Sequence, residues 1–337
     1  MRIGRQRWTG PWRAAVGLCG VLTLASLFTF WHQQHGQRAE AASPAAGYSL
    51  SVVPPAEVAV PATASHPAYT LYTPGGLGGA PPSPITLVVL HGMGGNGPGM
   101  AAPLLPLARS QGWNLIAPTI PYGEWRDPNQ LTGEELGLQP QLANLLEGVG
   151  TETGVPVGPR VLFFGFSRGA QAALRFAMLY PDRVEAVAAF SAGTYTLPTT
   201  SVKTAAGGTL AAPLPFGVAD LEQRAGWQVD PSRMSAVRFL IGVGSRDNRE
   251  GDVPRQWDPF VGKNRVERAE RYAASLSALG LPAQVVVVPD AGHELSAAMM
   301  THVSAFLTTA AADLQAQIAA ATTSEPVARV LPPGSPS

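Results

Sequence analysis

The most informative residues of this chain form the pentapeptide Gly165-Phe166-Ser167-Arg168-Gly169. The pentapeptide directly follows the apolar run 160–164 and precedes a stretch whose apolar residues recur with helical spacing. A serine hydroxyl is a poor nucleophile at neutral pH, so it needs a sharp turn that exposes it to a base and to backbone donors. The glycines on both sides of Ser167 leave room for such a turn. The pentapeptide therefore predicts a nucleophile elbow between a strand and a helix.

A serine nucleophile needs a general base, and only two histidines follow Ser167 in the sequence. His293 lies in a loop directly after the apolar run 284–288, whereas His302 falls within the predicted final helix. A loop after a strand places its side chains at the carboxyl edge of a parallel sheet. We therefore assign the base to His293 and expect His302 to be a surface or packing residue of the helix.

A carboxylate must orient the imidazole and stabilise the imidazolium that forms during proton transfer. Asp247 follows the apolar run 237–243 at the carboxyl end of a predicted strand. Asp252 and Asp290 compete with it, but Asp252 lies further into a polar loop. Asp290 precedes the histidine so closely that a role in a turn explains it better. We therefore predict that Asp247 completes a Ser-His-Asp triad.

A glycine-rich loop, 91–97, follows the first predicted strand of the parallel core and has the sequence HGMGGNG. Glycines leave backbone N–H groups unshielded, and such groups can hold the oxyanion of a tetrahedral intermediate. We expect the N–H groups of Met93 and Arg168 to form this oxyanion hole, and His91 to tie the loop in place. The glycine spacing also fits a dinucleotide fingerprint, but no acidic residue lies between 98 and 123 to hold the ribose. Nucleotide binding is therefore disfavoured.

Continuous apolar runs alternate with helical patterns through most of the chain, as is typical of strands that are covered on both faces. The expected strands are 85–90, 114–117, 160–164, 184–190, 237–243 and 284–288. The expected helices are 103–111, 133–147, 169–180, 263–279 and 295–320. This alternation predicts an α/β fold with a doubly wound, mostly parallel sheet, helices on both faces and a site at the carboxyl ends of the strands. The segment 69–72 predicts an earlier antiparallel strand, whose partner we expect within 48–53.

The composition limits the domain count and the partners. A chain of 337 residues with 45% apolar content can bury one large core, so we predict a single catalytic domain over 46–320 and a disordered, proline-rich tail over 321–337. The 23 basic and 23 acidic residues give no net charge, which disfavours nucleic acid as a partner. The only cysteine is Cys19, so the rest of the chain can form no intramolecular disulfide and no cysteine-ligated zinc site.

The N-terminal segment, 1–45, contains a predicted export signal or membrane anchor. Its last part is a predicted linker to the first strands. Four arginines precede the uncharged run 14–31, which is at the short end for spanning a bilayer and longer than most signal-peptide cores. The candidate cleavage site Ala39-Glu40-Ala41 lies well beyond that run, so we favour an uncleaved membrane anchor with an extracytoplasmic domain. Secretion after cleavage is the alternative. Lipidation of Cys19 fits less well because Leu18, which is not a small residue, precedes it.

The order of the oxyanion loop, Ser167, Asp247 and His293 resembles the α/β-hydrolase superfamily over about residues 69–320. Within it, the chain is similar to the polyhydroxybutyrate-depolymerase, feruloyl-esterase and dienelactone-hydrolase neighbourhood, although its nucleophile is not the cysteine of dienelactone hydrolases. The resemblance implies a serine carboxylic ester hydrolase that forms a covalent acyl-enzyme on a small-molecule or polymeric ester, with no metal or organic cofactor. The alternatives are an exported peptidase or amidase with the same triad and, more remotely, a non-catalytic binding module on the same fold.

The residues that would select the substrate are harder to identify. The segment 193–235 is rich in Thr, Ala, Gly and Pro and is long enough to form a small cap over the site. A surface insertion without substrate contact is the alternative. Tyr122, Trp125 and Trp257 lie in loops after predicted strands, so we name them as candidates for an apolar or aromatic acyl pocket. Taken singly, each of these aromatic residues is more often a packing residue than a binding residue.

Overall fold

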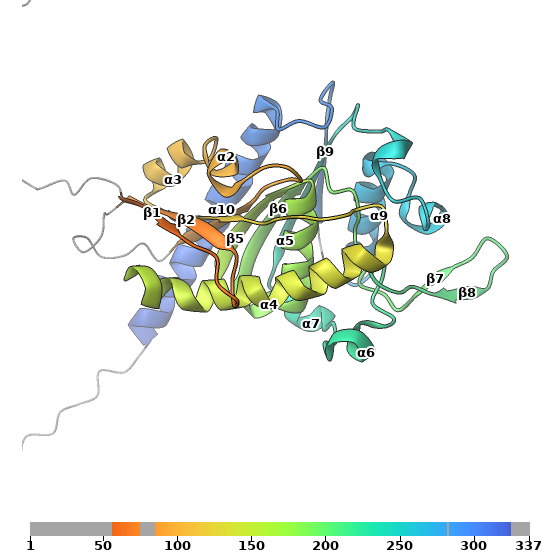
Figure 1. Ribbon diagram of the computed structural model, residues 1–337, viewed down its shortest axis with the longest axis horizontal. Helices are drawn as coiled ribbons and strands as arrows, with labels where there is room; N and C mark the ends of the chain where they lie inside the picture. Colours follow the sequence, from red (N-terminus) through yellow and green to blue (C-terminus); the bar gives the residue numbers. More distant parts are fainter. Residues whose placement is uncertain (1–55, 75–84, 282, 325–337) are drawn as a thin grey trace, which may run out of the picture. The chain divides into compact units, whose positions relative to one another are not determined.

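The computed structural model describes residues 56–74, 85–281 and 283–324. The main sheet contains β1 (Ala56–Val60), β2 (Ala68–Thr73), β3 (Thr86–Leu90), β4 (Asn114–Thr119), β5 (Val161–Phe166), β6 (Val184–Phe190), β9 (Arg238–Gly244) and β10 (Ala283–Val288). Their order across the sheet is β1-β2-β4-β3-β5-β6-β9-β10 (Figure 1). The six strands from β4 to β10 run parallel, and β2 runs antiparallel to both of its neighbours. The predicted mostly parallel sheet is confirmed.

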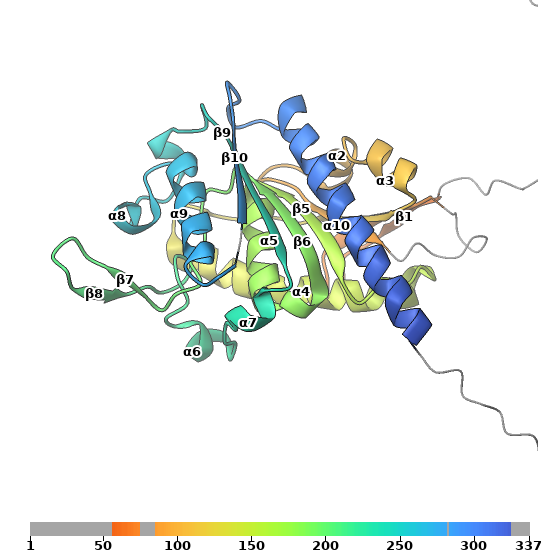
Figure 2. The same ribbon diagram turned by 180° about the vertical axis from the view of Figure 1, so that it is seen from behind.

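Helices cover both faces of this sheet, as expected from the alternation in the sequence. One face carries α4 (Pro128–Thr153), α5 (Arg168–Leu179) and α9 (Arg265–Ser277), and the other carries α2 (Gly97–Ala101), α3 (Leu105–Gln111) and α10 (Ala297–Ser324). Successive strand residues point to opposite faces, so in β3 Val88 and Leu90 enter the first core while Leu87 and Val89 enter the second. Figure 2 shows α10 lying across the face of the sheet that is opposite to α4 and α5.

The partner of β2 differs from the expected segment, 48–53, which lies outside the described residues. Strand β1 pairs instead with residues 69–73 of β2. Its Val58 and Val60 pack against the core, whereas Glu57 is exposed, so β1 has the alternation of an edge strand with one buried face. The prediction was wrong because the sequence AEVAV is rich in alanine and carries a glutamate, both of which are depleted in strands.

The two ends of the chain are only partly described. Helix α10 continues to Ser324, so the first four residues of the predicted tail, 321–324, are helical. The rest of that tail, 325–337, and the predicted anchor and linker, 1–45, lie outside the described residues. Among the helices that the structure describes, none is both long and apolar enough to cross a bilayer.

The segment 193–235 folds into a hairpin of β7 (Ser201–Lys203) and β8 (Thr209–Ala211), followed by the short helices α6 (Leu221–Ala225) and α7 (Pro231–Met234). The hairpin projects away from the main sheet in both Figure 1 and Figure 2. Helix α7 contacts the 3-10 turn η1 (Pro181–Arg183), which directly precedes β6. This helix therefore packs at the amino end of β6, at the opposite end of the strand from the predicted site.

Two glycines allow α5 to begin directly against the sheet. A Cβ atom on Gly169 would lie 2.0 Å from the carbonyl oxygen of Leu90, and one on Gly165 would lie 2.4 Å from the carbonyl oxygen of Gly169. Real Cβ atoms do not approach backbone oxygens so closely. Only glycine at both positions therefore permits the contact between the start of α5 and the ends of β3 and β5.

We predict that Gly169→Ala lowers the free energy of unfolding by about 3 kcal/mol or more, because the added methyl group forces α5 away from β3. Urea unfolding of the variant and the wild type measures this difference. The matched control is Gly137→Ala, since Gly137 is exposed on α4 and a Cβ atom there would meet nothing within 4 Å. We expect that control to stabilise the protein by up to about 1 kcal/mol. Equal effects of the two substitutions would contradict the proposed close approach.

Candidate active site

Ser167 lies at the sharp turn between β5 and α5. Its φ is 54°, which places a non-glycine residue in the left-handed region of backbone space. Its backbone N–H donates to the carbonyl oxygen of Phe190 at the end of the neighbouring strand β6 (2.8 Å), so the turn is held to the sheet. The residue is 9% exposed. This geometry presents the Ser167 hydroxyl at the carboxyl end of the central strand, as an elbow requires.

The structure brings Ser167, His293 and Asp247 into one hydrogen-bonded chain. The Nε2 atom of His293 lies 3.1 Å from the Oγ of Ser167, and its Nδ1 atom lies 2.7 Å from the Oδ2 of Asp247. The three residues follow β5, β10 and β9, so the parallel strands deliver them to the same edge of the sheet. In this arrangement Nδ1–H donates to the carboxylate, which leaves Nε2 free to accept the serine proton.

The competing residues lie in other settings. Asp290 is exposed, forms an ion pair with Arg246 and has its N–H bonded to Ser245, which fits the turn predicted for it. His302 is exposed on α10 and lines a groove between that helix, β9 and β10. Ser167, Asp247 and His293 do not line this groove. Asp252 lines the pocket in front of Ser167 but makes no hydrogen bond to His293.

The carboxylate of Asp247 is buried yet kept ionised. Its side chain is only 2% exposed, and burial by itself raises the pKa of a carboxyl group. The hydrogen bond to His293 and the positive charge of Arg265 outweigh burial, so the pKa of Asp247 is lowered from 3.8. The guanidinium Nη1 of Arg265 lies 3.0 Å from the Oδ1 of Asp247. Arg265 could not be identified from the sequence, because an arginine in the first turn of a helix carries no motif that connects it with Asp247.

The glycine-rich loop is fixed beside Ser167 by His91. The Nε2 of His91 accepts a hydrogen bond from the N–H of Ile120 (2.9 Å), so its Nδ1 carries the proton and donates to the carbonyl oxygen of Gly92 (2.6 Å). Burial lowers the pKa of His91, which favours the neutral imidazole that these bonds need. The loop and the elbow are in tight contact, because a Cβ atom on Gly92 would lie 3.2 Å from the Cβ of Ser167.

The two predicted oxyanion donors line the same pocket as Ser167. Met93 is 41% exposed and lines the pocket together with Ser167. Arg168 is the first residue of α5, and the N–H groups of a helix's first turn have no partner within the helix. Met93 and Arg168 thus line the same pocket as Ser167, and the oxyanion hole that we expect from their N–H groups stays a prediction.

Comparisons with known proteins bear on the fold. No protein-family model and no curated protein matches the sequence. Among solved structures, the chain is similar to poly(aspartic acid) hydrolase-1 from Sphingomonas sp. KT-1, with 19% identity, a TM-score of 0.54 and coverage of 75% of this chain and 97% of that chain. A poly(3-hydroxybutyrate) depolymerase from Bordetella parapertussis shows 23% identity, a TM-score of 0.48 and coverage of 67% and 79%.

Three observations indicate the same fold: the strand order, the left-handed backbone conformation of Ser167 between β5 and α5, and the similarity to the first of these solved structures. The chain has the α/β-hydrolase fold. The resemblance stated from the sequence is thus confirmed at the level of the fold.

The pocket of this α/β-hydrolase fold opens directly in front of the serine and has a volume of about 440 Å³. Its lining residues are Gly92, Met93, Trp125, Phe166, Ser167, Arg168, Gln171, Gly193, Thr194, Asp252, Pro254, Arg265 and His293. Of the segment 193–235, only the first two residues reach this lining. The described geometry therefore favours a surface insertion over the cap that we considered for this segment.

Trp125 lines the pocket, but the two other aromatic candidates do not. Tyr122 packs edge-on against His91, and the guanidinium of Arg168 lies over its ring at 5.1 Å. Trp257 stacks on Phe216 and contacts Phe260. Tyr122 and Trp257 are therefore not among the residues that line this pocket, because both rings pack against neighbouring side chains instead.

The side chain of Arg168 has a structural role that is separate from its backbone. It forms an ion pair with Glu134 and lies 3.5 Å from Glu135, and Arg175 lies 3.0 Å from the same Glu135. Glu135 and both arginines are buried. This network joins α4 to the first two turns of α5, and so supports the helix whose N-terminus faces the pocket.

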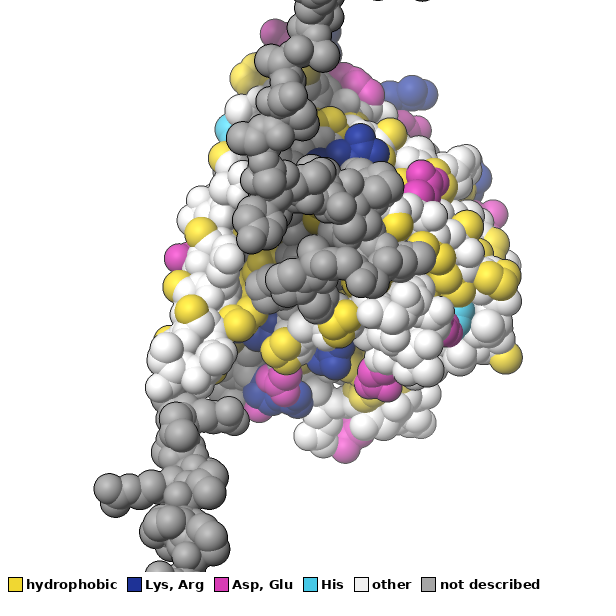
Figure 3. Space-filling view, turned by 90° about the vertical axis from the view of Figure 1, so that its left-hand side faces the viewer, with side chains coloured by type: hydrophobic (Ala, Val, Ile, Leu, Met, Phe, Trp, Pro, Cys, Tyr) yellow, Lys and Arg dark blue, Asp and Glu magenta, His cyan; other side chains and the backbone are white. Residues whose placement is uncertain are grey.

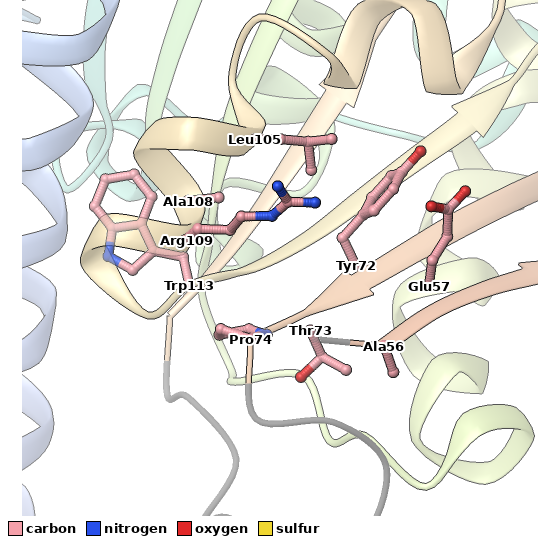
Figure 4. Close-up of a pocket in the computed structure, with 9 residues that line it drawn as sticks. All are labelled: Ala56, Glu57, Tyr72, Thr73, Pro74, Leu105, Ala108, Arg109 and Trp113. Atoms are coloured by element: carbon pink, nitrogen blue, oxygen red, sulfur yellow. The ribbon is translucent and has the colours of Figure 1, made fainter. Parts of the chain in front are cut away.

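A second hollow lies near β1, far along the sheet order from β9 and β10, and is much smaller. It has a volume of about 80 Å³ and lies between Tyr72, Glu57, Arg109 and Trp113 (Figure 4). It contains no nucleophile with an adjacent base. On the part of this side that Figure 3 leaves visible, acidic and basic side chains are intermixed, in keeping with the neutral composition. In the described part of the chain, no group of three or more His, Cys, Asp or Glu residues could hold a metal ion.

The lowered pKa of Asp247 predicts a pH dependence of stability. A carboxylate whose folded pKa lies below 3.8 stabilises the fold above that pH and loses its contribution as the pH falls through the folded value. We therefore expect the difference in unfolding free energy between the wild type and Asp247→Asn to be smaller below pH 3.8 than at about pH 5. Urea unfolding at a series of pH values measures this difference.

The control for this experiment is Asp313→Asn, because Asp313 is 46% exposed and pairs with Arg238 on the surface. Exposed ion pairs contribute little, so its difference from the wild type should stay within about 0.5 kcal/mol at each pH. A difference for Asp247→Asn that grows on acidification would show that the ionised carboxylate does not stabilise the fold.

Proposed function

We propose that this protein is a serine carboxylic ester hydrolase that acts through a covalent acyl-enzyme. The observation that carries the proposal is the hydrogen-bonded chain from Ser167 through His293 to Asp247 at the wall of an open pocket. Serine, imidazole and carboxylate in this order and at these distances are the parts that acyl transfer needs. The proposed substrate is a small-molecule or polymeric ester.

In the first half of the proposed reaction, the Oγ of Ser167 attacks the ester carbonyl carbon while its proton passes to Nε2 of His293. The carbonyl oxygen becomes an oxyanion, which the N–H groups of Met93 and Arg168 would hold; each such donor contributes on the order of 3 kcal/mol to the transition state. Asp247 stays ionised and stabilises the imidazolium. Collapse of the intermediate expels the alcohol, which takes the proton from His293 and leaves Ser167 acylated.

Water completes the proposed cycle. His293 removes a proton from a water molecule, whose oxygen attacks the acyl carbon and forms a second tetrahedral oxyanion. When this intermediate collapses, the bond to the Oγ of Ser167 breaks, and His293 returns the proton to the serine. The products are a carboxylic acid and the free serine. Every proton transfer uses the Nε2 atom, because Nδ1 remains bound to Asp247 throughout.

The same residues could attack an amide, which makes a peptidase or amidase the alternative within this chemistry. No contact of the described residues favours an amide leaving group. A non-catalytic binding module is less consistent with the site, since a chain that only binds has no need of all three hydrogen-bonded groups. We further propose, from the N-terminal segment 1–45, that the domain acts outside the cytoplasm, either anchored to the membrane or secreted.

We predict that Ser167→Ala lowers the rate of hydrolysis of p-nitrophenyl acetate and butyrate at least about a thousandfold, because the nucleophile is lost. The full-length protein is compared with the variant by following release of p-nitrophenol. A fluorophosphonate probe should label the wild type and not the variant. The control is His302→Gln, which changes an exposed histidine outside the pocket and should leave both readouts unchanged.

Two results would contradict this proposal. The first is equal hydrolysis rates for the wild type and Ser167→Ala, which would mean that another group carries the activity. The second is a folded wild-type protein that the probe does not label, which would restore the binding-module hypothesis. Turnover of a panel of peptide and amide substrates without turnover of esters would favour the amidase alternative.

A further inference from the structure

The carboxylate of Asp247 is held at both of its oxygens. Oδ2 faces His293, and Oδ1 receives a hydrogen bond from Nη1 of Arg265 at 3.0 Å. A carboxylate bound at one oxygen can rotate about its last side-chain bond, whereas a carboxylate bound at both is fixed in one plane. Arg265 therefore continues the chain of hydrogen bonds by one member beyond the triad.

Arg265 is placed for this contact at some electrostatic cost. It is the first residue of α9, where the positive end of the helix dipole disfavours a cation. Its side chain is only 9% exposed, so the guanidinium has also given up most of its water. Its Nη2 donates to the carbonyl oxygen of Asp252 (2.9 Å), and its Nε has no hydrogen-bond partner. Asp247 is the closest charge that offsets these costs.

Arg268 lies one turn further along α9 and is a structural arginine with which Arg265 can be compared. It is buried and donates to the carbonyl oxygens of Gly193 (2.6 Å), Gly262 (2.9 Å) and Pro254. It also forms an ion pair with Asp258. Like Arg265, Arg268 ties the loop after β9 to α9, but no hydrogen bond or ion pair joins it to Asp247.

We propose that Arg265 is a positioning residue of the triad, which holds the outer oxygen of Asp247 and thereby sets the orientation of His293 and the proton affinity of the His293–Asp247 pair. The proposal rests on the esterase function proposed above. Arg265 acts through Asp247, so its loss should disturb proton transfer more than it disturbs the fold.

The sign of the electrostatic effect follows from the charges around the pair. Asp247 is paired with the cation Arg265 and lies near enough to the phenol of Tyr195 to influence it, while the carboxylate of Asp252 lies 3.9 Å from Nη1 of Arg265. The positive charge of Arg265 reduces the negative potential that Asp247 presents to the imidazole. Removal of that charge makes the pair bind a proton more readily.

The test compares Arg265→Gln, Arg265→Lys and Arg268→Gln with the wild type, all as full-length proteins whose folding is checked by thermal unfolding. Two quantities are followed against pH: kcat/KM for p-nitrophenyl butyrate, and the NMR signals of the His293 imidazole, which His293→Gln identifies. The acid limb of kcat/KM and the NMR midpoint both report the coupled protonation of the His293–Asp247 pair. Because Arg265 also lines the pocket, kcat and KM are measured separately.

In Arg265→Gln we expect both midpoints to move to higher pH by about 0.5 to 1 unit. We also expect kcat to fall about tenfold to a hundredfold, because Asp247 is free to rotate. Arg265→Lys keeps the charge but cannot make both contacts of the planar guanidinium, so it should restore the midpoints and only part of kcat. Arg268→Gln should lower the unfolding temperature and leave the midpoints where they are.

The proposal is overturned if the midpoints of folded Arg265→Gln coincide with those of the wild type, or if Arg268→Gln moves them equally. If Arg265→Gln does not fold, Arg265→Met provides a second neutral side chain for the same comparison. A kcat for Arg265→Lys equal to that of the wild type also overturns the proposal. The NMR titration needs no substrate. A protein without esterase activity but with the expected shift would refute the proposed function and leave the role of Arg265 standing.

Discussion

The site depends on one backbone constraint, the left-handed conformation of Ser167 at φ 54°. Such a conformation costs a non-glycine residue of order 1–3 kcal/mol and persists only where the surroundings enforce it. Here Gly165 and Gly169 let α5 press against the sheet, and the Ser167 N–H is bonded to the end of β6. The buried network of Glu135 with Arg168 and Arg175 then holds α4 to the same helix. These contacts hold the start of α5, and with it the conformation of Ser167, against the sheet and α4.

The strand runs, the helices on both faces and the three residues at the strand ends could be predicted from the sequence, because each rests on a local signal. Continuous apolar runs indicate buried strands, and Ser167, Asp247 and His293 each follow such a run directly. Strand β1 lacked that signal, since its alternation within AEVAV is short and weakly apolar. Pairing with β2 gives it a place in the sheet, and pairing is a property of two distant segments.

The contacts that escaped prediction are all long-range and side-chain specific. Arg265 lies 18 residues after Asp247, and nothing in its neighbours distinguishes it from Arg268, although the two side chains have different partners. Tyr122 and Trp257 follow strands as Trp125 does, yet only Trp125 reaches the pocket. Whether a loop aromatic turns inward to the core or outward to a pocket depends on which elements lie next to it. That information is absent from the periodicity of the sequence.

Helix α9 connects the pocket wall with Asp247. Arg265 bonds to Asp247 and also to the carbonyl oxygen of Asp252, while Arg268 bonds to the carbonyl oxygens of Pro254 and Gly193. Asp252, Pro254 and Gly193 all line the pocket. The loop after β9 is thus held to α9 through its backbone carbonyl oxygens rather than through its side chains. The same arrangement means that a displacement of the wall near Asp252 reaches Asp247 through a single side chain, because Arg265 cannot keep both bonds if its two acceptors move apart.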